Sequence, residues 1–214
     1  MYKTILFLCL LFISTLCFGQ DTGWKLASEK DDIKVYTRTV ADSKLKAIKV
    51  ECSLPVRPSQ LVAAILDIDN SYQWVYHSKL NRIIKRISPS ELYYYAQVNV
   101  PWPVDNRDYV SHVMVSQNPK TKVITIDAPC VPGIVPLKKD MVRITHSTGK
   151  WTISPFENNA IKVTYQLELY PAGSVPAWLV NLFATQGPME TFQKLKLQVQ
   201  RNQYRDAKLD FVTD

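Results

Sequence analysis

SVPAWLVNLFATQGPMETFQKLKLQVQR, residues 174–201, is the stretch that decides the fold. Apolar side chains recur in it at helical spacing, for example at Leu179, Phe183 and Phe192, which predicts a long amphipathic helix. Pro176 suits the first turn of such a helix, because the N–H that proline lacks is unpaired there in any case. Pro188 lies in the middle and predicts a kink or a break, since it supplies no N–H and its ring clashes with the preceding turn.

The chain before this helix consists mainly of short alternating stretches typical of β-strands. One exception is a helix expected from Gln60 onward, with Ser59 as its N-cap. The predicted strands cover residues 33–40, 44–54, 81–87, 91–100, 107–116, 123–128, 141–147, 150–154 and 161–170. Such a run of strands followed by a long helix predicts an α+β fold with an antiparallel sheet in a single domain.

Both ends of the chain are expected to lie outside this domain, which we place at residues 22–203. Residues 1–19 combine Lys3 with an apolar run and a small-residue end, which predicts a cleaved signal peptide and export to the periplasm or the medium. An uncleaved membrane anchor is the alternative interpretation. Residues 204–214 are polar and predict a frayed C-terminal tail.

Composition limits the classes of function that the chain can serve. The 214 residues carry a formal net charge of +7 without a basic run interleaved with aromatic residues, so we expect no nucleic-acid partner. Cys52 and Cys130 follow the predicted signal peptide and could form one disulfide or remain two free thiols. The histidines His77, His112 and His146 do not stand at metal-ligand spacing with one another. We therefore predict no metal, no cofactor and no catalytic constellation.

Residues 101–110, PWPVDNRDYV, are the most specific motif in the middle of the chain. Arg107 and Asp108 stand next to each other at the start of a predicted strand, and we expect them to form a structural pair because an isolated buried charge is costly. With IKVYTR at residues 33–38, GKWTISP at 149–155 and YPAGSVPAWLVN at 170–181, this motif makes the chain resemble the START (StAR-related lipid-transfer) domain family. The phosphatidylcholine-transfer type of this family is the most similar in the final helix.

This resemblance implies a helix-grip fold of the START/Bet v 1-like kind, in which a curved antiparallel sheet wraps around the long C-terminal helix. It also implies that a monomer binds one hydrophobic ligand, such as a lipid, an acyl chain or a sterol-like molecule, in an internal tunnel and transfers it between membranes. The alternative from periodicity alone is a solid core, because the same apolar pattern lines a hollow or fills one. The residues expected to line the cavity are Tyr94, Val98, Tyr109, Ser111, Val113, Arg143, Tyr165, Leu167, Leu179, Phe183 and Phe192.

The loop at residues 129–140, PCVPGIVPLKKD, is the predicted gate at the membrane. Its apolar side chains stand next to two lysines, a combination that suits an anionic lipid surface. An ordinary proline-rich crossover is the alternative. The gate residues are Val131, Ile134, Val135, Leu137, Lys138 and Lys139.

The identity of the ligand depends on the face that begins at Arg107. Lipid-carrying members of the family that this chain resembles have a buried arginine at later positions of this face, where this chain has Val113 and Val115. We therefore expect a neutral or apolar ligand, unless Arg143 replaces the missing arginine. A helix-grip enzyme of cyclase or hydrolase type is the alternative function, and its catalytic candidates are Tyr109, His112, His146 and Arg143.

Overall fold

The computed structural model describes residues 23–40, 46–170, 172–173 and 175–214. The predicted signal peptide, the connection between the strands predicted at residues 33–40 and 44–54, and Ser174 at the start of the stretch 174–201 lie outside the described residues.

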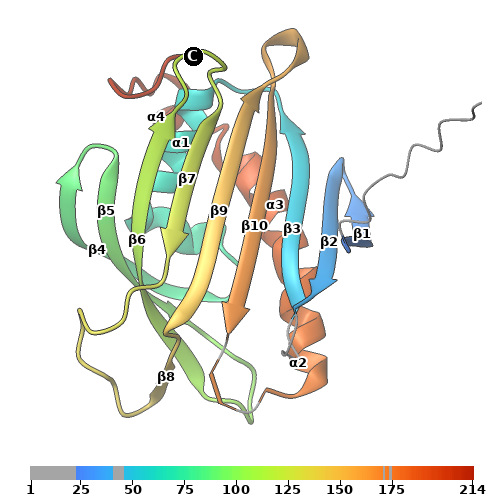
Figure 1. The fold of residues 1–214 in the computed structure, drawn as a ribbon, viewed down its shortest axis with the longest axis vertical. Helices are drawn as coiled ribbons and strands as arrows, with labels where there is room; N and C mark the ends of the chain where they lie inside the picture. The colour runs from blue at the N-terminus through green and yellow to red at the C-terminus, as the bar shows by residue number, and fades with distance from the viewer. Residues whose placement is uncertain (1–22, 41–45, 171, 174) are drawn as a thin grey trace, which may run out of the picture.

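One ten-stranded sheet forms the body of the molecule (Figure 1). Nine strands follow the order β1-β2-β3-β10-β9-β7-β6-β5-β4 with antiparallel pairing, and β8 pairs with β6 in parallel. The strand β10 lies between β3 and β9, so the last strand joins the N-terminal strands to the rest of the sheet. The strands are β1 (Lys25–Lys30), β2 (Ile33–Thr39), β3 (Lys46–Leu54), β4 (Ser78–Ser88), β5 (Glu91–Val98), β6 (Asn106–Gln117), β7 (Ile124–Pro129), β8 (Met141–Arg143), β9 (His146–Pro155) and β10 (Ile161–Tyr170).

The sheet differs from the sequence prediction in the parallel pair of β6 and β8, in β1 and in β9. The strand β1 was not predicted, because almost all of its side chains are exposed and it therefore lacks an apolar alternation. The strand β9 is continuous from His146 to Pro155, where the sequence predicted two strands interrupted near Gly149. Gly149 stays in the ladder and pairs with Leu167 on one side and Ala128 on the other. The glycine therefore lies inside a continuous strand here and does not mark a turn.

The first helix, α1 (Pro58–Leu66), continues into the 3₁₀ helix η1 (Ile68–Gln73), and a second 3₁₀ turn, η2 (Glu157–Asn159), connects β9 to β10. The N-cap of α1 is Arg57 and not Ser59, because Pro58 already occupies the first turn. Within the described part of the chain, no helix is both long enough and apolar enough to cross a membrane.

The C-terminal helix consists of α2 (Ala177–Asn181), the π-helical turn η3 (Leu182–Gln186) and α3 (Gly187–Gln198), followed by the short α4 (Asn202–Arg205). Pro188 does not break it, contrary to one of the predicted outcomes. The turn before Pro188 widens instead, so that Gly187 N–H bonds to Leu182 O, five residues back. A π turn of this kind accommodates a proline, which has no N–H to donate, and the helix continues beyond it.

The helix α3 crosses one face of the curved sheet, as Figure 1 shows, and buries its apolar stripe there. Phe192 and Leu195 are buried completely, in one core cluster with residues of α1 and of the sheet. This arrangement is the predicted helix-grip architecture.

The last residues are docked on the domain and do not form the frayed tail that their polar composition predicted. Tyr204 is buried and donates a hydrogen bond of 2.7 Å to the Asp67 carboxylate. The Asp214 carboxylate accepts hydrogen bonds from the Ser59 backbone N–H at 2.8 Å and from the Ser59 hydroxyl at 2.7 Å. It also forms an ion pair with Arg57 at 2.8 Å. Asp214 therefore supplies the cap that α1 lacks within its own sequence.

We expect Asp214→Ala to lower the free energy of unfolding by about 1 kcal/mol, the usual cost of losing an N-cap, and the melting temperature by about 2–4 °C. Thermal and urea unfolding measure this effect. Asp210→Ala removes the same charge from an exposed position four residues earlier and is the matched control. Equal melting temperatures for the two variants would contradict the capping role of Asp214.

Candidate functional site

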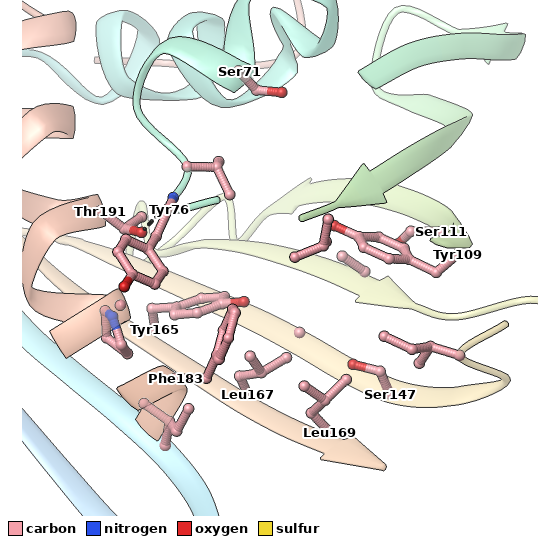
Figure 2. A pocket seen from close by; sticks show the side chains of 18 of the residues that line it. Ser71, Tyr76, Tyr109, Ser111, Ser147, Tyr165, Leu167, Leu169, Phe183 and Thr191 are labelled. Carbon is pink, nitrogen blue, oxygen red and sulfur yellow. Dashed lines mark hydrogen bonds between the residues drawn. The ribbon is translucent and has the colours of Figure 1, made fainter. Parts of the chain in front are cut away.

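A cavity of about 310 Å³ lies between the sheet and the C-terminal helix. Figure 2 shows Tyr109 and Ser111 on one side of it, and Ser147, Leu167 and Leu169 across the hollow. Its volume is at the lower end of the roughly 300–1,000 Å³ of small-molecule pockets. The structure thus decides between the two interpretations of the apolar pattern in favour of a hollow.

Strand alternation explains which side chains reach the cavity. On β6, Arg107, Tyr109, Ser111 and Val113 are every second residue and all line it. The neighbouring β5, β7, β9 and β10 contribute their inward residues in the same way. The helix closes the other side with Leu179, Val180, Phe183, Ala184, Gly187, Pro188, Thr191 and Phe192.

Aromatic rings form much of the apolar wall. Trp151 stacks on Phe192 with ring centroids 5.4 Å apart, and Tyr165 packs against Trp151 at 4.5 Å. Trp74 meets Trp151 edge-to-face at 6.5 Å. Rings in such contacts pack well against one another and present flat apolar surface, which suits hydrocarbon chains or fused rings.

The polar groups of the cavity are mostly neutral hydroxyls. The Tyr94 and Tyr109 hydroxyls lie 3.4 Å apart, and Ser111 lines the wall beside them. Burial raises the pKa of Tyr94 and raises the pKa of Tyr109 well above its ordinary value, and it raises the pKa of Tyr165 as well. These phenols are therefore protonated at neutral pH and can donate or accept hydrogen bonds without carrying charge.

Cys52 and Cys130 are both free thiols in the structure. Cys130 lines the cavity, and burial raises its pKa to about 11. Cys52 is buried on β3, where burial raises its pKa to about 12. Neither thiol is activated as a nucleophile, because nucleophilic cysteines have lowered pKa values.

The C-terminal helix packs closely against Tyr76, in the segment after η1. The Tyr76 backbone N–H donates to Thr191 Oγ1 at 3.0 Å, and the Tyr76 ring lies edge-to-face on Phe183 at 5.6 Å (Figure 2). A Cβ at Gly187 would stand 3.0 Å from the Tyr76 ring, closer than side chains normally pack. Gly187 thus permits the close approach that seals this side of the cavity.

Every predicted cavity residue except Arg143 lines the cavity: Tyr94, Val98, Tyr109, Ser111, Val113, Tyr165, Leu167, Leu179, Phe183 and Phe192. The prediction missed Trp151 on β9, although GKWTISP alternates and could have revealed it. It also missed Trp74 and Tyr76, which lie in irregular backbone after η1 and have no periodic signal.

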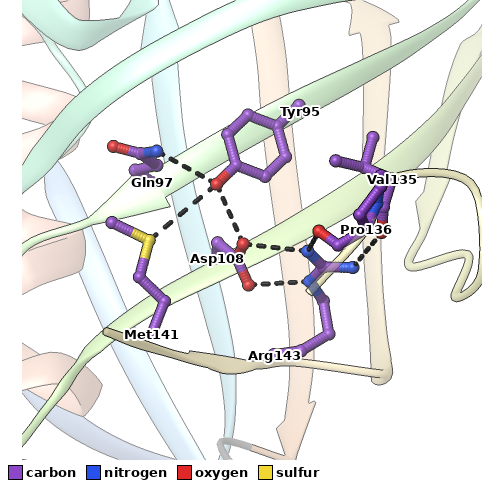
Figure 3. A network of polar contacts seen from close by, with 7 residues as sticks. All are labelled: Tyr95, Gln97, Asp108, Val135, Pro136, Met141 and Arg143. Carbon is purple, nitrogen blue, oxygen red and sulfur yellow. Dashed lines mark hydrogen bonds and ion pairs between the residues drawn. The ribbon is translucent and has the colours of Figure 1, made fainter. Parts of the chain in front are cut away.

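The predicted pairing of Arg107 with Asp108 is wrong. Neighbours in a strand point to opposite faces, so Arg107 faces the cavity while Asp108 lies on the other side of the sheet. There Arg143 donates to Asp108 through Nε at 2.7 Å and Nη2 at 2.9 Å, and Tyr95 donates its hydroxyl at 2.8 Å (Figure 3). Arg143 is therefore a structural partner of Asp108 and does not replace a head-group arginine in the cavity.

The predicted gate loop lies between β7 and β8, and none of Val131, Ile134, Val135, Leu137, Lys138 and Lys139 lines the cavity. Leu137 is 77% exposed and Ile134 is 42% exposed. Arg143 holds the base of the loop by donating to Val135 O at 2.9 Å and Pro136 O at 3.1 Å. The loop thus presents apolar and cationic side chains to solvent from a fixed base.

Of the four catalytic candidates, only Tyr109 lines the cavity. His112 is on the other face of β6, where its Nε2 lies 2.7 Å from Glu91 Oε1 and its ring stacks on Tyr93. His146 is exposed beside Thr145. Among the described residues, no group of three or more His, Cys, Asp or Glu side chains could hold a metal ion.

A curved sheet that encloses an apolar cavity against one helix defines a class of hydrophobic-ligand binding folds, and the comparisons identify the family. The START domain family model matches residues 14–205, so this chain belongs to the START domain family.

Two relatives and one solved structure illustrate the similarity. An uncharacterized protein of Pseudomonas aeruginosa is 31% identical over 81% of this chain and 85% of its own length. The phosphatidylcholine transfer protein of Bos taurus is 27% identical over 77% of this chain and 78% of its own length. The crystal structure of a STAR-related lipid transfer protein from Xanthomonas axonopodis matches this chain with a TM-score of 0.77 and 33% identity. The match covers 84% of this chain and 99% of the Xanthomonas chain.

Proposed function

We propose that this protein binds one lipid or similar hydrophobic molecule in its internal cavity and transfers it between membranes as a monomer. The cavity between the sheet and the C-terminal helix is the observation that carries this proposal. Its apolar walls remove the main barrier to moving a lipid, because each CH₂ that leaves a membrane for water costs about 0.8 kcal/mol. The names of the bovine and Xanthomonas relatives support the same function.

Native mass spectrometry of the purified protein, followed by lipid analysis of what it releases, tests this function. We expect one lipid per protein chain, either after purification or after incubation with mixed vesicles. A mass that stays free of lipid after that incubation would contradict the proposal. The same spectrum reports whether the protein is a monomer.

We propose that the end of the molecule that carries the loop at residues 131–140 docks on an anionic membrane. Leu137 is 77% exposed there beside Lys138 and Lys139. Two further large side chains belong to segments at this end: Trp102 is 90% exposed, and Trp178 on α2 is 48% exposed. In Figure 1, α2 and the loop that leads to β8 lie at the same end of the sheet. Exposed tryptophans and lysines at the same end of a molecule suit the interface of an anionic bilayer.

We expect Leu137→Asp to weaken binding to vesicles that contain phosphatidylserine by about tenfold or more, because it removes an inserting side chain and adds a repelled charge. Vesicle co-sedimentation measures this binding. Leu197→Asp is the matched control, because Leu197 is 74% exposed but lies near the far end of α3, away from α2. Equal binding by the two variants would disprove docking through the loop.

We also propose that the protein is exported, on the composition of residues 1–19. The intact mass of the protein recovered from the periplasm or the medium tests this, since cleavage removes the leader. Recovery of the full-length chain from the cytoplasm alone would contradict export.

A further inference from the structure

Arg107 stands at the junction of two hollows in this fold. It is the first inward residue of β6 and only 5% exposed. It lines the main cavity and also a neighbouring pocket of about 270 Å³, formed by the loop before β6, by β8 and by the segment before α2. The other residues of this pocket are Pro103, Val104, Asp105, Val142, Gly173 and Pro176.

The charge of Arg107 has no direct counterion in the described part of the chain. Its guanidinium donates to two backbone carbonyls, Asp105 O and Ala172 O, and forms no ion pair there. Burial lowers the pKa of Arg107, and the Asp105 carboxylate offsets this only in part because it is not within ion-pair distance. Arg143, by contrast, has the Asp108 carboxylate as a bidentate partner. A buried cation without a paired anion is costly, and an arginine stays protonated when buried.

Arg107 is also the only charged residue among the described residues that line the cavity. Along β6 the inward side chains change from this cation to the hydroxyls of Tyr109 and Ser111, and then to the apolar Val113. Six residues of strand separate Arg107 from Val113, which is about 20 Å at the usual rise per residue. The wall is therefore amphipathic along its length, with its charged end beside the second pocket.

Building on the lipid-binding function proposed above, we propose that Arg107 binds the anionic head of a single-chain amphiphile, a carboxylate or a phosphate, whose chain extends along Val113 toward the Trp151–Phe192 stack. The flat fork of a guanidinium matches either oxyanion through two parallel hydrogen bonds. The cavity volume of about 310 Å³ favours one chain over two. This assignment differs from the neutral ligand expected from Val113 and Val115, because the cation stands six residues before Val113 on the same face.

Four 16-carbon probes separate head-group charge from chain binding: palmitate, hexadecyl phosphate, methyl palmitate and hexadecanol. Their dissociation constants are measured at pH 8, where both anions are ionised, by displacement of a fluorescent fatty-acid analogue. We expect the unmodified protein to bind at least one anion about tenfold or more tightly than methyl palmitate or hexadecanol. Which anion binds more tightly distinguishes a carboxylate ligand from a phosphate ligand.

Arg107→Gln removes the cation but keeps a hydrogen-bonding side chain. We expect it to reduce the preference for anions to less than about twofold, with little change for methyl palmitate, and we expect Arg107→Lys to retain part of the preference. Arg86→Gln makes the same charge change at an exposed position of β4 and should leave the preference intact. Circular dichroism and thermal melting show whether each variant is folded.

The comparison of probes on the unmodified protein is decisive even if Arg107→Gln does not fold. Equal affinity for palmitate, hexadecyl phosphate and methyl palmitate would overturn the anion assignment and leave the lipid-binding function standing. If folded Arg107→Gln still prefers anions, the anionic head binds at another residue, and the proposed role of Arg107 is wrong. Failure to bind any of the four probes, together with a lipid-free native mass, would overturn the lipid-binding function itself.

Discussion

Gly149→Phe abolishes lipid loading and leaves the protein folded: this is the result that we expect if the hollow between the sheet and the helix is the ligand site. Gly149 lies in the middle of β9, between the inward-facing Ser147 and Trp151, so a side chain added there points into the cavity. A Cβ at this position would meet the Tyr165 hydroxyl at 3.5 Å and Ala128 O at 3.6 Å, which are ordinary contacts. The ring beyond it would occupy space that the ligand needs.

The expected stability effect separates this variant from a destabilised one. Filling a cavity commonly changes the free energy of unfolding by about 0.5–2 kcal/mol in the favourable direction, and a β-strand tolerates phenylalanine better than glycine. We therefore expect an unchanged or higher melting temperature, with lipid binding at least about tenfold weaker by native mass spectrometry and probe displacement.

Thr148→Phe is the matched control, because Thr148 is exposed on the other face of the same strand. It should bind lipid like the unmodified protein. Normal lipid loading of folded Gly149→Phe would show that the ligand lies elsewhere on the molecule.

The sequence predicted the strands of this fold well where one face of a strand is apolar. The strand β10 begins and ends at the predicted residues, Ile161 and Tyr170, because its alternation is regular throughout. The exposed β1 gave no such signal. Periodicity also selected the inward residues of β5, β6 and β10, but it could not distinguish a hollow from a core, since both require the same apolar face.

Local sequence patterns could not predict contacts between segments that are far apart in the chain. Arg143 stands 35 residues after Asp108, and Asp214 stands 155 residues after Ser59. No spacing rule connects such residues, so the sequence predicts the nearest opposite charge, Arg107, as the partner of Asp108. The alternation of β6 excludes that pairing, because residues 107 and 108 face opposite sides of the sheet. The face of the sheet on which a strand residue lies therefore predicts its ion-pair partner better than nearness along the chain does.

Asp108→Asn should be the most destabilising substitution on the outer side of the sheet. The Asp108 side chain is fully buried and accepts two hydrogen bonds from Arg143 and one from Tyr95 (Figure 3). Removing one charge of a buried ion pair leaves the other uncompensated, which typically costs about 3–5 kcal/mol. Urea unfolding at pH 7 measures this loss.

The pH dependence of stability gives this network a signature that a simple packing defect lacks. Burial alone would raise the pKa of Asp108, but the hydrogen bonds from Arg143 and Tyr95 outweigh it and hold the pKa below the ordinary value of 3.8. A carboxylate with a lowered pKa stabilises the fold fully above its ordinary pKa, and this stabilisation is lost as the pH falls through the lowered value. The unmodified protein should therefore lose stability below about pH 4 more steeply than Asp108→Asn.

The network also fixes the loop at residues 131–140, because the guanidinium that binds Asp108 donates to Val135 O and Pro136 O. Asp108→Asn should consequently speed amide hydrogen exchange in that loop and in β8, while exchange in β10 stays slow. Asp127→Asn is a suitable control, since Asp127 forms a largely exposed pair with Lys150 at 3.5 Å, and such pairs contribute about 0–1 kcal/mol. If Asp108→Asn and Asp127→Asn unfold at the same urea concentration, the buried pair does not anchor the loop at residues 131–140, and that loop depends on other contacts.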